Sequence, residues 1–465
     1  MATRLAAVAS VAPEERKGDL QAQVAARELA EAYHSYGVAG KAWFLATLAS
    51  EYGTSGSRVY DAITGWRSAT VSGTGPREDR YFKAERALRE SLVPGYDRLF
   101  ALLRQQPGGM KFVVDLRRDV RSLLRAPPEK AGGLVAATRA DLAALDKYMH
   151  SVLSSWFAVG ALDLASITWD TPASTLEKIM DYERVHRMDG WEDLKQRLGP
   201  GRRCYAFFHP AMPDEPLIFV EVALLRSMAS SIQDVLSEVP TLADEEASST
   251  AIFYSISATQ AGLAQIELGN FLIKRVVNAL LAESSSPAYF ATLSPIPGFS
   301  SWLASSHAAG ELEAMLPPLG AVALATLDET LEAAPRSLGD ALMAHLASPD
   351  WHKSPAIADA LQATLLPLCA RYLTSVRPPR AGEPAASALD PVANFHLRNG
   401  ARVERINWLG DSSPRGLRQS AGLMVNYRYS LRYIDENNYR YANEGAITVS
   451  PAIADILSTV TSSPL

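Results

Sequence analysis

The feature that most constrains the fold is a change in the apolar pattern near residue 160. Before this point, apolar residues recur every three to four positions, as Leu20, Val24 and Leu29 do. After it, short continuous apolar runs stand between turn signals. The first pattern is typical of helices with one buried face, and the second of strands buried on both faces. The sequence therefore predicts a helical part followed by a part that contains a sheet.

The helical part is expected to form an all-helical bundle over residues 1–158. Its helices are predicted at about 18–36, 39–51, 79–106, 111–125 and 138–156, with glycine-rich breaks between them. This part has apolar helix faces to bury but no group of candidate catalytic residues, so we expect it to assemble the chain into a homo-oligomer. The basic run Arg117-Arg118-Asp119-Val120-Arg121 is interpreted as a solvated helix face.

A chain of 465 residues is too long for one ordinary core, so residues 159–465 are expected to form a second domain. The strands and helices predicted in it indicate an α/β domain. Strands are predicted at 204–208, 217–225, 251–257, 289–293 and 421–431. A helix over about 262–283 separates the third strand from the fourth. This order predicts that those two strands pair in parallel. A further helix is predicted over 355–375, with Pro367 in its middle.

Charge and composition exclude several classes of protein. A net charge of −6 gives no basic footprint for nucleic acid, and no apolar stretch is long enough for a transmembrane helix. Cys204 and Cys369 lie in apolar runs without a CxxC partner, which favours buried free thiols, with a disulfide between them as the alternative. No histidines stand at metal-ligand spacing, so no metal site is predicted. Neither terminus shows a targeting signal, and we expect a cytoplasmic location.

The strand–turn–helix at 251–283 is the first candidate site. A helix N-terminus offers unpaired N–H groups to an anion such as pyrophosphate, and Gly262 and Gly269 allow close approach of the backbone. Acetyltransferases hold CoA with a Gln/Arg-x-x-Gly-x-Gly/Ala run at such a turn. In the corresponding window, Ala264 to Gly269, only the last glycine fits. Simple packing is therefore the alternative interpretation.

The second candidate is Ser294, in the run Leu293-Ser-Pro-Ile-Pro-Gly-Phe299. A residue before proline is extended, so Ser294 is expected to end a strand, and two prolines stiffen the loop behind it. A rigid loop at the end of a strand suits a catalytic hydroxyl. A plain turn serine is the alternative.

The third candidate is His396, on a short helix that Asp390 can cap, with Pro391 in its first turn and Gly400 after its end. His396 is predicted near the C-terminal end of this helix, and this position favours the imidazolium form. A single histidine can equally well serve a structural role.

Several runs, taken together, resemble the malonyl-CoA decarboxylase family. The matching stretches are Ala251-Ile-Phe-Tyr-Ser-Ile-Ser257, Glu267-Leu-Gly269, Phe271-Leu-Ile-Lys-Arg-Val-Val277, Leu293-Ser-Pro-Ile-Pro-Gly-Phe299, Asn394-Phe-His396, Arg405-Ile-Asn-Trp408 and Asn426-Tyr-Arg-Tyr429. The likeness covers the chain from about residue 150 to its end and is weaker before that. It implies an α+β fold, with the helical bundle followed by an acetyltransferase-like (GNAT-like) α/β domain.

The resemblance also implies a site and a reaction. CoA is expected at Ala264, Gln265, Ile266, Glu267, Leu268, Gly269 and Asn270. Malonyl-CoA would lose CO2 to give an enolate, which His396 protonates with the help of Ser294, while Tyr429 donates to the substrate. The thioester itself accepts the electrons, so no cofactor is expected beyond the CoA of the substrate. Such a reaction belongs to fatty acid metabolism. An acyl-CoA-dependent N-acyltransferase and a non-catalytic CoA-binding scaffold are the alternatives.

Overall fold

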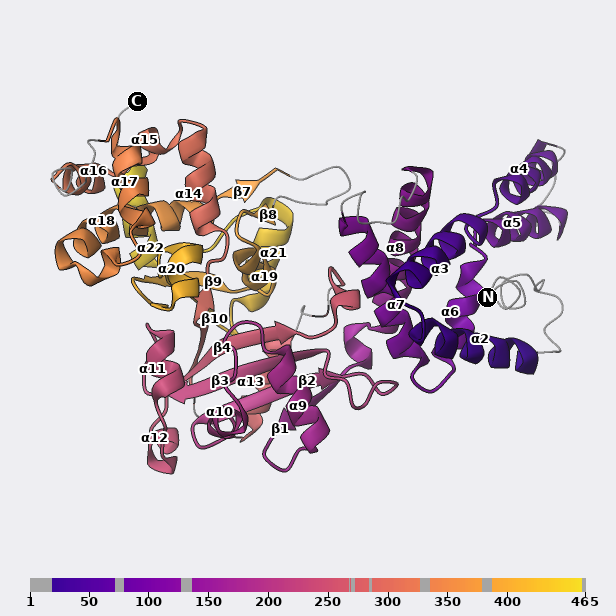
Figure 1. The fold of residues 1–465 in the computed structure, drawn as a ribbon, viewed down its shortest axis with the longest axis horizontal. Helices are drawn as coiled ribbons and strands as arrows, with labels where there is room; N and C mark the ends of the chain where they lie inside the picture. The colour runs from indigo at the N-terminus through magenta and orange to yellow at the C-terminus, as the bar shows by residue number, and fades with distance from the viewer. Residues whose placement is uncertain are drawn as a thin grey trace. The chain divides into compact units, whose positions relative to one another are not determined.

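The structure is a computed structural model that describes residues 19–71, 79–126, 136–266, 268, 272–283, 287–326, 335–378 and 387–461. The chain forms two compact units. The first unit comprises Met1–Asp163, Phe208–Leu217 and Ala258–Leu268, and the second comprises Leu164–Phe207, Ile218–Ser257 and Gly269–Leu465. A helical N-terminal region precedes a mixed sheet with helices, so the predicted α+β class is confirmed (Figure 1).

Helices build the first unit. They are α2 (Asp19–His34), α3 (Val38–Glu51), α4 (Gly56–Val71), α5 (Asp79–Ser91), α6 (Tyr96–Arg104), α7 (Gly109–Arg125) and α8 (Ala136–Trp156), followed by the 3-10 turn η2 (Val159–Ala161). The single helix predicted over 79–106 is wrong, because Pro94 excludes its preceding residue from helical geometry and separates α5 from α6. The sequence analysis missed α4, whose Tyr60 and Ile63 are exposed and mark no buried face.

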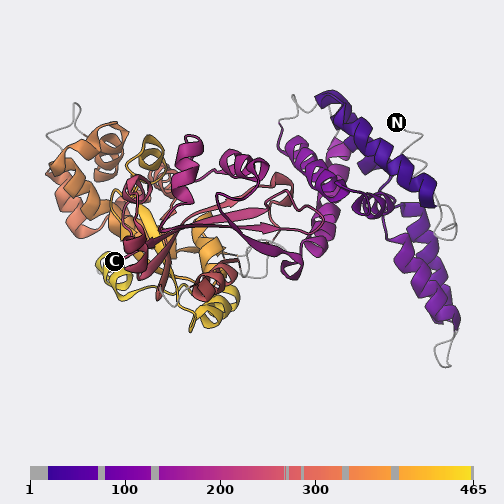
Figure 2. The ribbon, with the colours of Figure 1, turned by 90° about the horizontal axis from the view of Figure 1, so that it is seen from below.

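The second unit is built around an eight-stranded sheet of order β1-β2-β3-β4-β5-β10-β6, in which β9 pairs with β10. Its strands are β1 (Asp163–Ile167), β2 (Arg202–Phe208), β3 (Ile218–Leu225), β4 (Thr250–Ala258), β5 (Tyr289–Thr292), β6 (Ser294–Pro295), β9 (Arg402–Asn407) and β10 (Met424–Tyr429). The predicted strands are confirmed, and β4 pairs with β5 in parallel as expected. Figure 2 shows the strands side by side, with helical segments above and below them.

The helices of this unit fall into two groups. Those that precede β5 or lie between residues 391 and 444 are α9 (Ala173–Tyr182), α10 (Trp191–Arg197), α11 (Ile232–Ser237), α12 (Leu242–Glu246), α13 (Leu272–Glu283), α19 (Pro391–Arg398), α20 (Pro414–Ser420) and α21 (Ile434–Glu444). The others are α14 (Phe299–Ala308), α15 (Leu312–Met315), α16 (Pro318–Ala325), α17 (Leu338–Ala347), α18 (Pro355–Thr374) and α22 (Pro451–Thr461), with the turn η5 (Trp351–Lys353) and the strand pair β7 (Val376–Arg377) and β8 (Ser387–Ala388). Of this second group only α18, with Pro367 inside it, was predicted.

The helix predicted over 262–283 is wrong in its first part. Only the 3-10 turn η3 (Ala261–Leu263) forms there, and α13 begins at Leu272. Gln265 has φ of 70°, a left-handed conformation that a continuous right-handed helix does not allow. The chain therefore leaves β4 through a turn before α13.

Two further expectations concern cysteines and membranes. Cys204 and Cys369 are both buried and free, as predicted. Over the residues that the structure describes, no helix is long and apolar enough to span a membrane.

Candidate active site

Ser294, His396 and Tyr429 meet in the second unit, although they come from β6, α19 and β10. Ser294 Oγ lies 3.1 Å from His396 Nε2, and His396 Nδ1 lies 2.7 Å from the Tyr429 hydroxyl. All three side chains are buried, with at most 5% of their surface exposed. The imidazole thus has a hydroxyl group at each of its nitrogens, an arrangement that can accept and release a proton within a buried site.

The sheet sets the position of Ser294. Val425 of β10 pairs with Ser294, and Tyr429 pairs with Phe290, so β10 spans both short strands. The side chain of Asn426 donates 2.7 Å to the Thr292 carbonyl and fixes the segment between β5 and β6.

Thr292 is a polar member of the site that the sequence analysis missed. Ser294 Oγ donates to Thr292 Oγ1 over 2.8 Å, and the same oxygen accepts the Tyr427 N–H over 3.1 Å. The signal was present, because residues i and i+2 of an extended segment point to the same side. Thr292 gives the serine hydroxyl a second partner besides the histidine.

Asp390 connects the serine loop to the histidine helix. One carboxylate oxygen accepts the N–H groups of Val392 and Ala393 at 2.9 Å each, so Asp390 caps α19 as predicted. The carboxylate also accepts the Tyr372 hydroxyl at 3.4 Å, and its Oδ2 lies 3.6 Å from where a β-carbon on Gly298 would stand, in the loop after Ser294. The fully buried Asp390 therefore contacts both the helix that carries His396 and the loop that follows Ser294.

Burial decides the protonation of the site. It lowers the pKa of His396 to about 3, so the imidazole is neutral in the free protein. The expectation that the helix end favours an imidazolium is therefore wrong, because desolvation exceeds the effect of the helix dipole. Burial also raises the pKa of Tyr429 well above its ordinary value, which keeps its hydroxyl protonated.

A neutral His396 permits two hydrogen-bond patterns. If Nε2 carries the proton, it donates to Ser294, Ser294 donates to Thr292, and the Tyr429 hydroxyl donates to Nδ1. If Nδ1 carries the proton, it donates to Tyr429 and Ser294 donates to Nε2. The first pattern pairs both imidazole nitrogens and the Ser294 and Tyr429 hydroxyls. In the second pattern the Tyr429 hydroxyl proton has no acceptor among these four residues, so the first pattern is favoured.

The expected CoA window lies partly outside the described residues, namely at Glu267, Gly269 and Asn270. Ala264, Gln265, Ile266 and Leu268 are described and belong to the first unit. The N–H groups of Ala264, Ile266 and Leu268 already donate to carbonyls within the turn. Among the described residues, the N–H of Gln265 has no acceptor.

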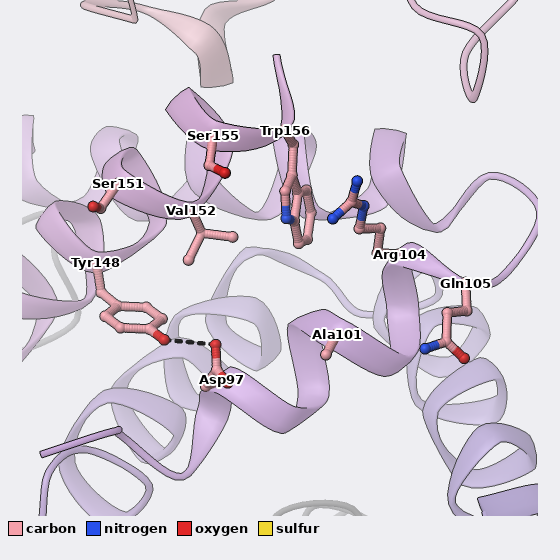
Figure 3. A pocket seen from close by; sticks show the side chains of 9 residues that line it. All are labelled: Asp97, Ala101, Arg104, Gln105, Tyr148, Ser151, Val152, Ser155 and Trp156. Carbon is pink, nitrogen blue, oxygen red and sulfur yellow. Dashed lines mark hydrogen bonds between the residues drawn. The ribbon is translucent and has the colours of Figure 1, made fainter. Parts of the chain in front are cut away.

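A separate pocket of about 600 Å³ lies in the first unit between α6 and α8 (Figure 3). In it, the Tyr148 hydroxyl donates to Asp97 over 2.5 Å, and the Arg104 guanidinium lies 5.2 Å from the Trp156 ring centre. The pocket contains none of the predicted site residues. No group of three or more His, Cys, Asp or Glu suited to a metal ion occurs among the described residues.

Comparison with known proteins agrees with the geometry. The family described as "Malonyl-CoA decarboxylase C-terminal domain" matches residues 160–464, and "Malonyl-CoA decarboxylase N-terminal domain" matches residues 52–157. The mitochondrial malonyl-CoA decarboxylase of Anser anser anser is 41% identical over 381 residues, which cover 81% of this chain and 72% of that protein. The enzyme of Rattus norvegicus is 40% identical, with coverages of 81% and 74%.

Solved structures give the same result over nearly the whole chain. The crystal structure of malonyl-CoA decarboxylase from Rhodopseudomonas palustris shares 34% identity, covers 98% of both chains and has a TM-score of 0.80. The structure of the protein from Agrobacterium vitis shares 36% identity, covers 98% of both chains and has a TM-score of 0.79. With both halves of the sequence matched, this chain belongs to the malonyl-CoA decarboxylase family.

Proposed function

We propose that this chain decarboxylates malonyl-CoA to acetyl-CoA and CO2, with Ser294 and His396 as the catalytic residues. Membership of the family supports the reaction. The observation that carries the choice of residues is the buried hydrogen-bond chain from Thr292 through Ser294 and His396 to Tyr429.

The reaction breaks the bond between the α-carbon and the malonyl carboxylate. The carboxylate leaves as CO2, and its electron pair moves into the thioester to form an enolate. A donor near the thioester oxygen stabilises this charge, and a proton must then reach the α-carbon. The Ser294 hydroxyl is suited to the first task because its neighbours hold it in place.

The proton comes from His396 in this proposal. The imidazole is neutral in the free protein, but a bound malonyl carboxylate close to it favours the charged form and raises its pKa. His396 then takes up a proton, passes it to the α-carbon directly or through Ser294, and returns to the neutral state. In this proposal the negative charge of the malonyl carboxylate therefore promotes the protonation of His396, the proton donor.

Binding through the CoA part is assigned to the window from Ala264 to Asn270, where the N–H of Gln265 has no acceptor among the described residues. No cofactor besides the substrate's own CoA takes part in this proposal. We also propose a homo-oligomer assembled through the helical region, and a cytoplasmic location. Light scattering at micromolar concentration and cell fractionation test these two points.

The test measures CO2 and acetyl-CoA released by the purified protein from malonyl-CoA alone. Ser294→Ala and His396→Ala should each lower kcat by about 10²–10⁴, the range for general acid–base catalysis. Ser305→Ala, at an exposed position on α14, serves as the control and should keep wild-type turnover.

Two outcomes would contradict the proposal. Wild-type kcat in His396→Ala would remove the assigned proton donor. Turnover that appears only when an amine acceptor is added would favour the alternative, an acyl-CoA-dependent N-acyltransferase.

A further inference from the structure

Tyr427 of β10 lies flat against the imidazole of His396, although the proposed chemistry assigns it no part. The centres of the two rings are 4.5 Å apart and their planes differ by 25°, which is a stacked arrangement. Both side chains are buried, with 0% and 3% of their surface exposed. The Tyr427 ring therefore covers one face of the histidine inside the protein.

The backbone of Tyr427 holds the other end of the same cluster. Its N–H donates over 3.1 Å to Thr292 Oγ1, which also accepts the Ser294 hydroxyl. Tyr429, two residues further along β10, lies on the same side of the strand, and its hydroxyl reaches His396 Nδ1. The extended chain of β10 thus fixes the Tyr427 ring relative to both catalytic candidates.

The hydroxyl of Tyr427 does not account for this residue. It is buried and has no hydrogen-bond partner among the residues that the structure describes. Burial, together with the nearby Asp390 carboxylate, raises the pKa of Tyr427 well above its ordinary value, so the hydroxyl stays neutral. Since an unpaired buried hydroxyl costs stability, the contribution of Tyr427 to the site comes from its ring.

The proposed reaction needs a charged imidazole in a place that disfavours charge. Burial lowers the pKa of His396 to about 3, and no charged side chain among the described residues offsets this effect. Ser294 and Tyr429 place neutral hydroxyls at the two ring nitrogens. The Tyr427 ring covers the face, and the Phe395 ring stands edge-on with its centre 5.1 Å away. An aromatic face attracts a cation, and this attraction is stronger where water is absent.

We infer that Tyr427 is a positioning residue for the proton transfer, and that its ring stabilises the imidazolium of His396. The inference rests on the proposed function, because it takes His396 as the proton donor to the enolate carbon. When the malonyl carboxylate binds and His396 takes up a proton, the ring face attracts the new charge and keeps the imidazole plane in place. The proton then leaves for the α-carbon, and His396 is neutral again.

Steady-state kinetics over a range of pH tests this role. Tyr427→Leu removes the ring but keeps an apolar side chain, and should lower kcat by about 10- to 30-fold, with KM changed by less than about threefold. Because kcat requires the charged imidazole in the substrate complex, it falls as the pH rises through the pKa of His396 in that complex. Without the ring this pKa is lower, so the fall should occur about one pH unit lower.

Tyr427→Phe keeps the ring and removes only the unpaired hydroxyl. It should therefore restore the wild-type pH profile, with kcat within about threefold of wild type. If Tyr427→Leu does not fold, Tyr427→Met provides the same test with an unbranched side chain.

Phe219→Leu is the matched control. It removes a ring that is 0% exposed from β3, which β4 and β5 separate from β10 in the sheet. Thermal unfolding should show a loss of stability in Phe219→Leu as in Tyr427→Leu, because both leave a cavity. The kcat and the pH profile of Phe219→Leu should be those of the wild type.

A second measurement does not depend on turnover. Sulfoacetyl-CoA carries a sulfonate in place of the malonyl carboxylate and cannot lose CO2, so it holds the complex before the reaction. Nitrogen NMR of histidine-labelled protein in this complex reports the charge of His396, and His396→Gln assigns the signal. The fraction of imidazolium at pH 7 should be lower in Tyr427→Leu than in the wild type or in Tyr427→Phe.

The inference is overturned if a folded Tyr427→Leu keeps the wild-type kcat and pH profile, or if Tyr427→Phe loses as much activity as Tyr427→Leu. A wild-type protein that binds the analogue but releases no CO2 from malonyl-CoA refutes the proposed reaction, while the imidazolium fractions still decide the role of the ring. A wild-type complex in which His396 stays neutral overturns both the inference and the assigned proton donor, whereas released CO2 would still support the decarboxylation.

Discussion

The Ser294–His396 cluster and the turn at residues 261–266 are held in different ways. The cluster lies in a sheet, and its hydroxyl and imidazole groups hydrogen bond to one another in a buried site. The turn is held by side chains of α7 and α8 that are more than a hundred residues away in sequence. The difference shows that hydrogen bonds within the sheet fix the cluster, whereas side chains of neighbouring helices fix the turn.

Outside the two proposed catalytic residues, the largest effect is expected at Asp390, which caps the helix of His396. Asp390→Ala removes the cap of α19 and the acceptor of the Tyr372 hydroxyl, and should cost about 2–4 kcal/mol in the free energy of unfolding. A displaced His396 should lower kcat by about 10–10², with a small change in KM. Urea unfolding and steady-state kinetics measure the two effects.

Ser413→Ala is the control for this prediction, because Ser413 caps α20 in the same way by accepting the Gly416 N–H. It should cost about 1 kcal/mol of stability and leave kcat unchanged. An equal fall of kcat in both variants would show that Asp390 has no special connection to the cluster.

Substitution of Gly262 should disturb the packing of the turn at residues 261–266 against α7. Gly262→Ala places a methyl group against the Val114 carbonyl and should cost about 1–3 kcal/mol, together with a higher KM for malonyl-CoA. Gly65→Ala, in α4, meets open space and should instead stabilise the protein by about 0.5–1 kcal/mol. Thermal unfolding of the two variants measures the contrast, and a neutral Gly262→Ala would argue that the turn does not depend on α7.

The cluster should also make stability depend on pH. The pKa of His396 is about 3 in the folded protein, below its ordinary 6.5, so only the unfolded chain takes up this proton between those values. Stability is therefore lost as the pH falls below 6.5, by about 2 kcal/mol at pH 5 from this group.

Urea unfolding at pH 7 and pH 5 tests the dependence, with His396→Gln for comparison. The variant should lose less stability than the wild type between the two pH values. Equal losses would mean that His396 is not held in the neutral form.

The smallest effect is expected at Tyr429. Tyr429→Phe removes one neutral hydrogen bond to His396 Nδ1 and should lower kcat by about three- to tenfold. A KM effect without a kcat effect would instead favour the sequence-based expectation that Tyr429 donates to the substrate. Kinetics with malonyl-CoA distinguish the two roles.

Local sequence predicted most of the elements that carry the candidate site, although Ser294 opens the short strand β6 and does not end β5 as expected. Continuous apolar runs gave β2 to β5 and β10, since strands buried on both faces need such runs. Asp390, Pro391 and Gly400 delimited the helix of His396, because caps act over only a few residues. Ser294 and His396 were selected from local loop and helix signals together with the family resemblance.

The tertiary structure alone decided which distant groups meet and what charge they carry. It brought Thr292, Ser294, His396 and Tyr429 into one chain of hydrogen bonds. Burial there lowers the pKa of His396 and keeps the imidazole neutral, although the helix C-terminus favours the charged form. The tertiary structure also turned Arg117 inward, where its Nη1 donates to the carbonyl of Gly262, 145 residues away. Periodicity and helix caps depend on residues close in sequence. Desolvation and the choice of hydrogen-bond partners depend on the whole fold, so they cannot be predicted from single segments.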